Sequence, residues 1–233
     1  MANTFALPDL ELRPALHKFG AAQTPVVVID NFCSDLEPII AAAAALAPFP
    51  PAGNHYPGVR RVIQPTDTAY AYIEDLLERA APFVGGAFDV DRFELVEASF
   101  SVVTCPPERL SPVQRTPHFD ATDGGYFAVM HYLSETAGTA FYRHRATATE
   151  RVTNAGLNAY IAAAQRESAR TTASYIVDSN EYYECIGAVT GCPNRLVIYP
   201  GNLLHSGIIL PEARLSSDPR QGRLTTNIFI RAT

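Results

Sequence analysis

The sequence predicts an α+β protein that is mainly β, with helices in its N-terminal part and a barrel or sandwich of short strands after them. From Phe93 onward, seven short runs rich in Val, Ile, Tyr, Phe and Thr are separated by turn residues. Two segments before Phe93 are rich in alanine and leucine and are typical of helices. Hydrophobic residues make up 47% of the 233 residues, which is enough to bury a large core. We predict one domain, 1–233, with a helical part at about 1–92 and a β core at about 93–233.

The N-terminal part is expected to contain one strand and two helices. The β-branched run at 26–30 reads as a buried strand. Ser34 and Glu37 form a capping-box pattern that opens a helix over 34–47, and prolines follow it. A second helix is predicted to start near Asp67 and to end at Gly85 and Gly86.

The β core is predicted from alternating and β-branched runs, with one helical insertion at 154–170. The expected strands are 93–104, 126–133, 139–142, 174–178, 182–189, 195–199 and 224–231.

Charge and composition exclude several classes of function. The net charge of -6 gives no basic surface for phosphates, so we expect no nucleic acid partner. No basic leader with an apolar stretch and no bilayer-length apolar run occurs, so we expect a cytoplasmic protein without a membrane partner. The four cysteines fit neither a zinc pair nor a redox Cys-x-x-Cys motif, and we expect free thiols.

A candidate metal site combines His118, Asp120 and His205. His118 and Asp120 are two positions apart, so on an extended segment their side chains point to the same face. His205 follows the strand predicted at 195–199 and a turn. Two imidazoles and one carboxylate are the ligand set that holds Fe(II) on one face and leaves the other face open.

The last predicted strand carries a polar face beside this candidate site. Arg223, Thr225 and Asn227 alternate along it. A guanidinium group matches a carboxylate in two parallel charge-assisted hydrogen bonds, and a hydroxyl can add a third. Taken alone, Arg223 would be read as half of a surface ion pair. Its place after the two metal-ligand segments favours a carboxylate-binding role instead.

The order of motifs over 93–233 resembles the core of prolyl-hydroxylase-like 2-oxoglutarate/Fe(II)-dependent dioxygenases. That core reads His-x-Asp, Tyr-Leu-Asn, Gly-Gly-x-x-x-Phe, a distal His and Arg-x-Ser. The corresponding segments here are His118-Phe119-Asp120, Tyr132-Leu133-Ser134, Ala137-Gly138 with Phe141, His205, and Arg223-Leu224-Thr225. The chain departs from the pattern at Ser134 and Ala137, and by a longer spacing between His205 and Arg223.

The resemblance implies a double-stranded β-helix, or jelly roll, with the N-terminal helices packed outside it. It also implies a hydroxylase-type enzyme that uses Fe(II), 2-oxoglutarate and O2, with His118, Asp120 and His205 as the catalytic metal ligands. Because Asp120 is present, hydroxylation or desaturation is favoured over halogenation.

For the cosubstrate, the same resemblance implies that Arg223 binds the distal carboxylate of 2-oxoglutarate and that Tyr132 donates a hydrogen bond to it. Thr225 is a further candidate for that carboxylate. The long loop at 210–221 leaves Arg214 and Arg220 as alternatives to Arg223.

Substrate residues are predicted from cations and aromatic groups near the core. Arg143 and Arg145 could hold an anionic substrate, although a solvated strand end is the plainer interpretation. Tyr56 lies in the segment 55–60, which could form a lid or pack as a surface loop. His131 should face away from Tyr132, and we expect a structural role for it.

Several alternatives remain open at this point. The expected substrate is a small molecule, an amino acid or a short peptide, and a homodimer is compatible with the sequence. A cupin-type jelly-roll metalloprotein, or a non-catalytic protein that binds metal or ligand, would share the scaffold.

Overall fold

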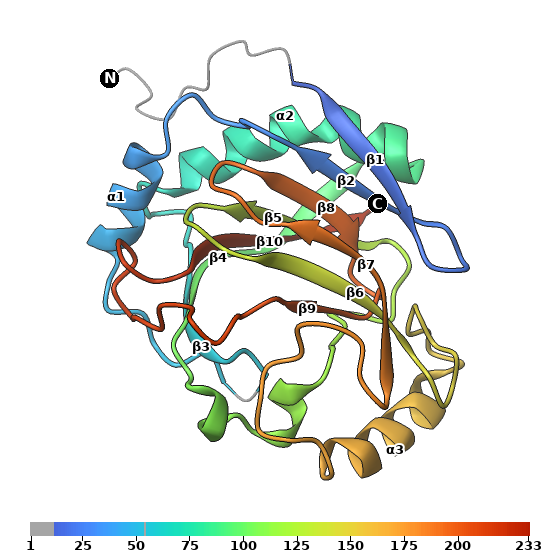
Figure 1. The fold of residues 1–233 in the computed structure, drawn as a ribbon. Coiled ribbons are helices and arrows are strands. Elements are labelled where there is room, and N and C mark those ends of the chain that lie inside the picture. The colour runs from blue at the N-terminus through green and yellow to red at the C-terminus, as the bar shows by residue number, and fades with distance from the viewer. Residues whose placement is uncertain (1–11, 54) are drawn as a thin grey trace.

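Two antiparallel β-sheets form the centre of the molecule (Figure 1). The computed structural model describes residues 12–53 and 55–233. The larger sheet has the strand order β1-β2-β8-β5-β10-β4-β3, and the smaller sheet has the order β7-β6-β9. The strands are β1 (Pro14–Phe19), β2 (Thr24–Ile29), β3 (Gly58–Val62), β4 (Phe93–Val103), β5 (Tyr126–Tyr132), β6 (Gly138–His144), β7 (Tyr183–Thr190), β8 (Leu196–Pro200), β9 (His205–Gly207) and β10 (Leu224–Ala232).

Side chains of the larger sheet alternate between an outer apolar face and an inner face that lines a pocket. On β10, Leu224 and Ile228 belong to the outer core, whereas Thr225 and Asn227 line the pocket. This alternation follows from the two-residue repeat of a strand. The register between strands therefore decides which polar groups share the pocket.

Helices α1 (Glu37–Ala45) and α2 (Tyr70–Phe88) cover the outer face of the larger sheet (Figure 1). Ile73, Leu76, Ala80 and Val84 of α2 are spaced three or four residues apart and are fully buried. That spacing places them on one side of the helix. Each large aliphatic side chain buried there contributes about 1.5–3 kcal/mol, which anchors the sheet whose inner face carries the site.

The smaller sheet is covered by α3 (Leu157–Ser168), on the opposite side of the molecule from α2 (Figure 1). Tyr160 of α3 packs with Tyr142 of β6 and Tyr183 of β7 in one apolar cluster. The other face of the smaller sheet packs toward the larger sheet through Phe141 and Val189. Both faces of each sheet are thus partly apolar, and the pocket opens between the sheets.

The helix boundaries differ from those predicted. α1 begins at Glu37 rather than Ser34, and the Ser34–Glu37 capping box does not form, since the Glu37 N–H donates to Asp35 Oδ1 at 2.9 Å. α2 begins at Tyr70 and continues through Gly85 and Gly86 to Phe88. Packing of its apolar side against the sheet outweighs the cost of glycine in a helix, which is about 1 kcal/mol per residue.

Two strand predictions also need correction. The segment 174–178 is a loop, because Tyr175 packs into a small cluster with Val103 and Ile209 instead of pairing in a ladder. The N-terminal part, predicted to contain one strand at 26–30, contributes β1 and β3 to the larger sheet as well as β2, which is the predicted strand. The remaining predicted strands and α3 are confirmed within a few residues.

The resulting architecture is mainly antiparallel β, with three α-helices among the described residues, and is consistent with a jelly-roll-like fold. None of the helices in residues 12–53 and 55–233 combines the length and apolar character that crossing a membrane requires.

Candidate metal centre and pocket

His118 and His205 are brought together by direct backbone pairing. The N–H of His118 donates to the His205 carbonyl at 2.9 Å, and the N–H of His205 donates to the His118 carbonyl at 2.8 Å. The N–H of Asp120 donates to the Gly201 carbonyl at 2.7 Å. Segments 81 to 87 residues apart in the chain are therefore held in one register, and that register sets the spacing of the three side chains.

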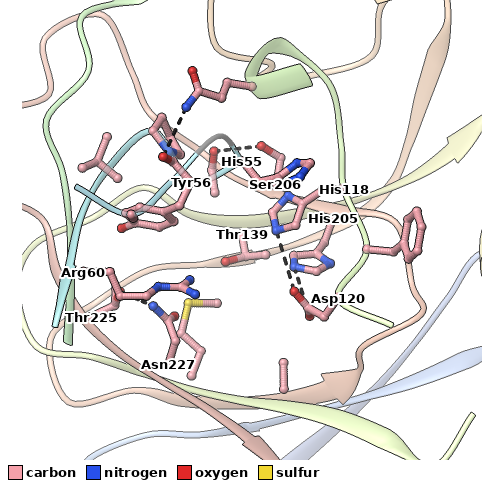
Figure 2. Close-up of a pocket in the computed structure, with 18 of the residues that line it drawn as sticks. His55, Tyr56, Arg60, His118, Asp120, Thr139, His205, Ser206, Thr225 and Asn227 are labelled. Carbon is pink, nitrogen blue, oxygen red and sulfur yellow. Dashed lines mark hydrogen bonds and ion pairs between the residues drawn. The ribbon is translucent and has the colours of Figure 1, made fainter. Parts of the chain in front are cut away.

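One ligand atom from each of His118, Asp120 and His205 lies within 4.8 Å of the others (Figure 2). Nε2 of His118 is 3.9 Å from Oδ1 of Asp120, and Nε2 of His205 is 3.7 Å from Oδ2. The two imidazole rings have centroids 4.2 Å apart. These separations leave room for one ion between the three groups. The predicted triad is thus assembled in space.

The tautomer of His205 suits metal binding. Its Nδ1 lies 2.8 Å from the Leu203 carbonyl, which can only accept a hydrogen bond, so Nδ1 carries the proton. Nε2 then presents its lone pair toward Asp120. A histidine ligand oriented by a hydrogen bond to a backbone carbonyl is the usual arrangement in metal sites.

The environment of the Asp120 carboxylate also favours a bound cation. Burial raises the pKa of Asp120, with partial compensation from His205 and Arg60. Oδ2 of Asp120 is buried and has no hydrogen-bond partner among the described residues. An unpartnered buried carboxylate oxygen is costly, and a divalent cation would remove that cost.

His118 is expected to be a neutral imidazole at neutral pH. Its ring faces the hollow of the pocket, so that 49% of its side chain is accessible. The pocket walls nevertheless remove enough water to lower the pKa of His118 well below 6.5, and the neighbouring His205 and Arg60 lower it further. A neutral imidazole is the form that binds metal. The donor set and its environment therefore fit Fe(II) or a similar divalent ion.

The pocket beside the triad has a volume of about 380 Å³. This lies at the lower end of the range for small-molecule sites, about 300–1,000 Å³. Apolar and aromatic side chains, including Tyr126, Met130 and Phe229, form part of its wall. Thr139 and Asn227 supply polar groups.

Arg223 is a buried cation in this pocket, with only 8% of its surface exposed. Its Nε donates to Thr136 Oγ1 at 2.7 Å, and Nη2 makes a long contact of 3.4 Å with the Gly138 carbonyl. Within residues 12–53 and 55–233, Arg223 forms no ion pair with a carboxylate. A buried charge without a counter-charge points to an anionic ligand.

The family of the protein follows from its sequence over almost the whole chain. The sequence model of a family of unknown function, DUF6445, matches residues 10–230. The chain belongs to the DUF6445 family. No curated protein matches it.

Solved structures resemble this DUF6445 chain in fold. HygX from Streptomyces hygroscopicus, with nickel, 2-oxoglutarate and hygromycin B bound, is 14% identical, with 90% of this chain and 83% of HygX covered and a TM-score of 0.54. A prolyl-4-hydroxylase from Pseudomonas putida is 13% identical, with 91% and 95% covered and a TM-score of 0.50. At these identities the likeness shows a shared fold alone.

Of the other residues expected to bind the cosubstrate in this DUF6445 protein, one lines the pocket and three do not. Thr225 lines the pocket, and its Oγ1 accepts a hydrogen bond from Asn227 Nδ2 at 3.4 Å. Tyr132 is fully buried and does not line the pocket. Its hydroxyl lies 2.7 Å from the hydroxyl of Thr139, and Thr139 lines the pocket in its place. Arg214 and Arg220 are exposed and also lie outside the pocket lining.

Two of the predicted substrate residues lie away from the pocket. Arg143 forms an ion pair with Glu184 and lies 3.9 Å from Glu150. Arg145 donates to the Asn180 carbonyl at 3.0 Å. Neither arginine lines the pocket, so the plainer interpretation of a charged strand end fits their positions.

Tyr56 does line the pocket, as predicted for the segment 55–60. Burial raises the pKa of its hydroxyl, and the cations Arg223 and Arg60 partly offset the increase. The phenol therefore stays protonated at neutral pH and can donate a hydrogen bond.

Sequence reasoning did not single out Thr139 and Arg60, which both line the pocket (Figure 2). Thr139 could have been found by alternation, since it shares a face of β6 with Phe141. Arg60 was expected on a loop with Tyr56, but it belongs to β3, where pairing with β4 fixes its direction. His131 faces away from Tyr132, as predicted, and its Nδ1 lies 2.7 Å from the hydroxyl of Tyr72 on α2. Burial lowers the pKa of His131 to about 4.

Proposed function

We propose that this protein is an Fe(II)- and 2-oxoglutarate-dependent oxygenase that oxidises a small substrate. The observation that carries the proposal is the pairing of two features in one pocket. His118, Asp120 and His205 present a two-histidine, one-carboxylate ligand set, and Arg223 is buried there without a carboxylate partner. A metal and a dicarboxylate would satisfy both features.

The proposed roles follow from the contacts of each residue. His118, Asp120 and His205 hold the metal, with the Leu203 carbonyl orienting His205. Arg223 binds the distal carboxylate of 2-oxoglutarate through the N–H groups that Thr136 does not occupy. Thr225 and Thr139 add hydroxyl groups to the same wall, and Tyr132 acts by orienting Thr139.

Bound Fe(II) would supply the redox chemistry with 2-oxoglutarate and O2 as cosubstrates, because three protein ligands leave coordination positions open. The protein residues have to place a C–H bond beside the metal and keep bulk water out. The apolar wall formed by Tyr126, Met130 and Phe229 serves both purposes. The pocket volume of about 380 Å³ favours a small molecule or a short peptide end over a folded protein surface.

For the fold, we propose that the two facing sheets form a double-stranded β-helix. The central strands β8, β5, β10 and β4 of the larger sheet and β7, β6 and β9 of the smaller sheet would be its two layers. HygX has 2-oxoglutarate and nickel bound, and the Pseudomonas putida neighbour is a prolyl-4-hydroxylase. Those ligands and activities are compatible with the residues in this pocket.

The experiment that tests the proposal is an anaerobic titration of the protein with Fe(II) and 2-oxoglutarate, monitored by visible absorption. Chelation of the metal by the 2-oxo acid is expected to produce a charge-transfer band. The band should be lost or strongly weakened in Asp120→Ala, because one metal ligand is removed. In Arg223→Ala the band should need far more 2-oxoglutarate. Oxygen-dependent formation of succinate then establishes turnover.

The other outcomes assign a different function. If metal binds but no band forms at any 2-oxoglutarate concentration, the protein is a cupin-type metalloprotein and Arg223 is dispensable for its ligand. If the band forms without any oxygen-dependent succinate, the protein binds metal and ligand without catalysis. Failure to bind metal at all would contradict the whole assignment.

A further inference from the structure

Two adjacent arginines on β3, Arg60 and Arg61, point to opposite faces of the larger sheet. Arg61 forms an ion pair of 3.1 Å with Asp67, which precedes α2 on the outer side. Arg60 instead lines the pocket. The strand alternation explains the difference, and it leaves two guanidinium groups, those of Arg60 and Arg223, in one small pocket.

The guanidinium of Arg60 is held in place but is not saturated with hydrogen bonds. Its Nε donates to Ser101 Oγ at 3.1 Å, and its Cζ lies 5.1 Å from the centre of the Tyr56 ring. The nearest carboxylate oxygen, Oε1 of Glu97, is 3.9 Å from Nη1, which is too far for a hydrogen bond. Glu97 is 39% exposed and is not part of the pocket lining. Both Nη groups of Arg60 therefore lack a hydrogen-bond acceptor among the described residues.

Arg60 and the metal centre face one another across the pocket. Figure 2 shows Arg60 with Thr225 and Asn227 on one side and the three candidate metal ligands on the other. The strand register places Arg60 beside Ser101, and Ser101 beside Thr225, in one row across the inner face of the sheet.

The charges of the filled pocket leave Arg60 without a counter-charge inside the pocket. A divalent metal, the Asp120 carboxylate, doubly charged 2-oxoglutarate and the Arg223 cation together sum to zero. Arg60 then contributes one positive charge that no group inside the pocket balances, because Glu97, 3.9 Å away, lies outside the pocket lining and is partly exposed. Among the described lining residues, Asp120 is the only carboxylate, so nothing else in the pocket would pair with an ammonium group of a substrate. A ligand with one negative charge and no positive charge balances this arrangement.

We infer that Arg60 binds the carboxylate of a small, singly charged substrate and so selects which molecule is oxidised. The two Nη groups would form a bidentate pair with that carboxylate, and Asn227 lies beside it to donate a further hydrogen bond. The rest of the substrate packs against Tyr126, Met130 and Phe229 on the way to the metal. This inference rests on the proposed oxygenase function, since it assumes that Arg223 and the metal are taken up by 2-oxoglutarate.

The test uses matched probes that differ only in charge. N-acetyl amino acids carry one carboxylate, and the corresponding N-acetyl amino-acid amides are neutral and nearly the same shape. Binding of each is measured by ligand-observed NMR to the protein loaded with Zn(II) and 2-oxoglutarate, so that no turnover occurs. Arg60→Gln keeps a donor for Ser101 and removes the charge, and Arg61→Gln is the matched control on the opposite face of the same strand.

We expect one or more N-acetyl amino acids to bind at least about tenfold more tightly than their amides. Arg60→Gln should lose that preference, and Arg61→Gln should keep it. The inference is overturned if no N-acetyl amino acid binds, if the amides bind equally well, or if Arg60→Gln keeps the preference. It is also overturned if the Fe(II)–2-oxoglutarate band in Arg60→Gln requires much more 2-oxoglutarate, because Arg60 would then hold the cosubstrate.

The same titration separates this inference from the proposed function. If the parent protein shows no Fe(II)–2-oxoglutarate band but still prefers carboxylates through Arg60, the oxygenase function fails and the anion site stands. If the band forms and the preference is absent, the oxygenase function stands and the substrate assignment fails.

Discussion

Replacing Arg223 by glutamine is expected to weaken 2-oxoglutarate binding strongly while leaving the fold almost as stable as before. Nε of Arg223 is occupied by Thr136, and Nη2 makes only a 3.4 Å contact with the Gly138 carbonyl. The N–H groups of Nη1 and the second N–H of Nη2 thus remain free to form a bidentate pair with the distal carboxylate of the cosubstrate. Each hydrogen bond to a charged group contributes about 1.5–3 kcal/mol.

The loss in Arg223→Gln should therefore be about 2–4 kcal/mol, because glutamine keeps one neutral donor. At about 1.4 kcal/mol for each factor of ten, the 2-oxoglutarate dissociation constant should rise roughly 30- to 1,000-fold. The free protein gains from losing an unpaired buried charge and loses the hydrogen bond to Thr136, so its stability should change by only about 1 kcal/mol. A change of that size moves Tm by about 2–4 °C in a chain of this length.

The assay combines two measurements on the same protein samples. The Fe(II)–2-oxoglutarate absorption band gives the dissociation constant, and calorimetric melting of the metal-free protein gives Tm. Arg214→Gln and Arg220→Gln are the controls, since both arginines are exposed and lie outside the pocket lining. The reasoning is refuted if Arg223→Gln binds 2-oxoglutarate like the parent, or if one of the controls shows the large loss instead.

Three further outcomes are expected. His131 has a folded-state pKa of about 4, below its ordinary 6.5; the unfolded chain therefore binds the proton first, and stability falls by about 3 kcal/mol as pH drops from 6.5 to about 4. Urea unfolding across that range should show a smaller loss in His131→Gln, and an equal loss would contradict the assignment. Asp120→Asn should lower the affinity for Fe(II) or Zn(II) by at least about 100-fold in calorimetric titrations, and unchanged affinity would remove Asp120 from the ligand set. Gly138→Ala should destabilise the fold by about 3 kcal/mol or more, because Gly138 has φ +114 and an added Cβ would lie 2.0 Å from the Val189 carbonyl oxygen. Gly86→Ala, with no atom within 4 Å of the added Cβ, should instead stabilise α2 by about 0.5–1 kcal/mol. Equal unfolding midpoints for Gly138→Ala and Gly86→Ala would contradict the claim that the backbone at Gly138 requires glycine.

The predicted metal site depended on features that are local in the chain. His118 and Asp120 share a face because they are two residues apart on an extended segment, whatever the rest of the fold does. Thr225 and Asn227 share a face of β10 for the same reason, and Arg223 directly precedes that strand. Short-range periodicity of this kind can be read without knowing which strands are neighbours.

Predictions failed where long-range packing opposed a local signal. Gly85 and Gly86 looked like the end of a helix, yet α2 runs through them because its apolar side is held against the sheet. The β-branched and aromatic run at 174–178 looked like a strand, yet Tyr175 is buried by Val103 and Ile209 and finds no strand partner. Local propensities amount to tenths of a kcal/mol per residue, and burial of one large side chain exceeds them.

The roles of the arginines show the same division. The residue types alone indicated that an arginine should bind an anion near the metal, and Arg143 and Arg145 were the arginines predicted as substrate contacts. The structure leaves Arg143 beside Glu184, where its charge is compensated, and turns Arg60 toward the pocket. Whether a cation is free to bind a ligand depends on which carboxylates the fold places beside it.

The sequence by itself determined the mainly β character, most strand positions, the candidate ligand set of His118, Asp120 and His205, and the polar face that begins at Arg223. These depend on residue type and on spacing within one strand. Only the tertiary structure decided that β1, β2 and β3 extend the larger sheet, that Thr139 stands between Tyr132 and the pocket, and that Arg60 lines the same pocket as the candidate metal ligands. These features depend on pairing between distant strands, whose register is set by the burial of the whole apolar core and is not encoded in any one segment.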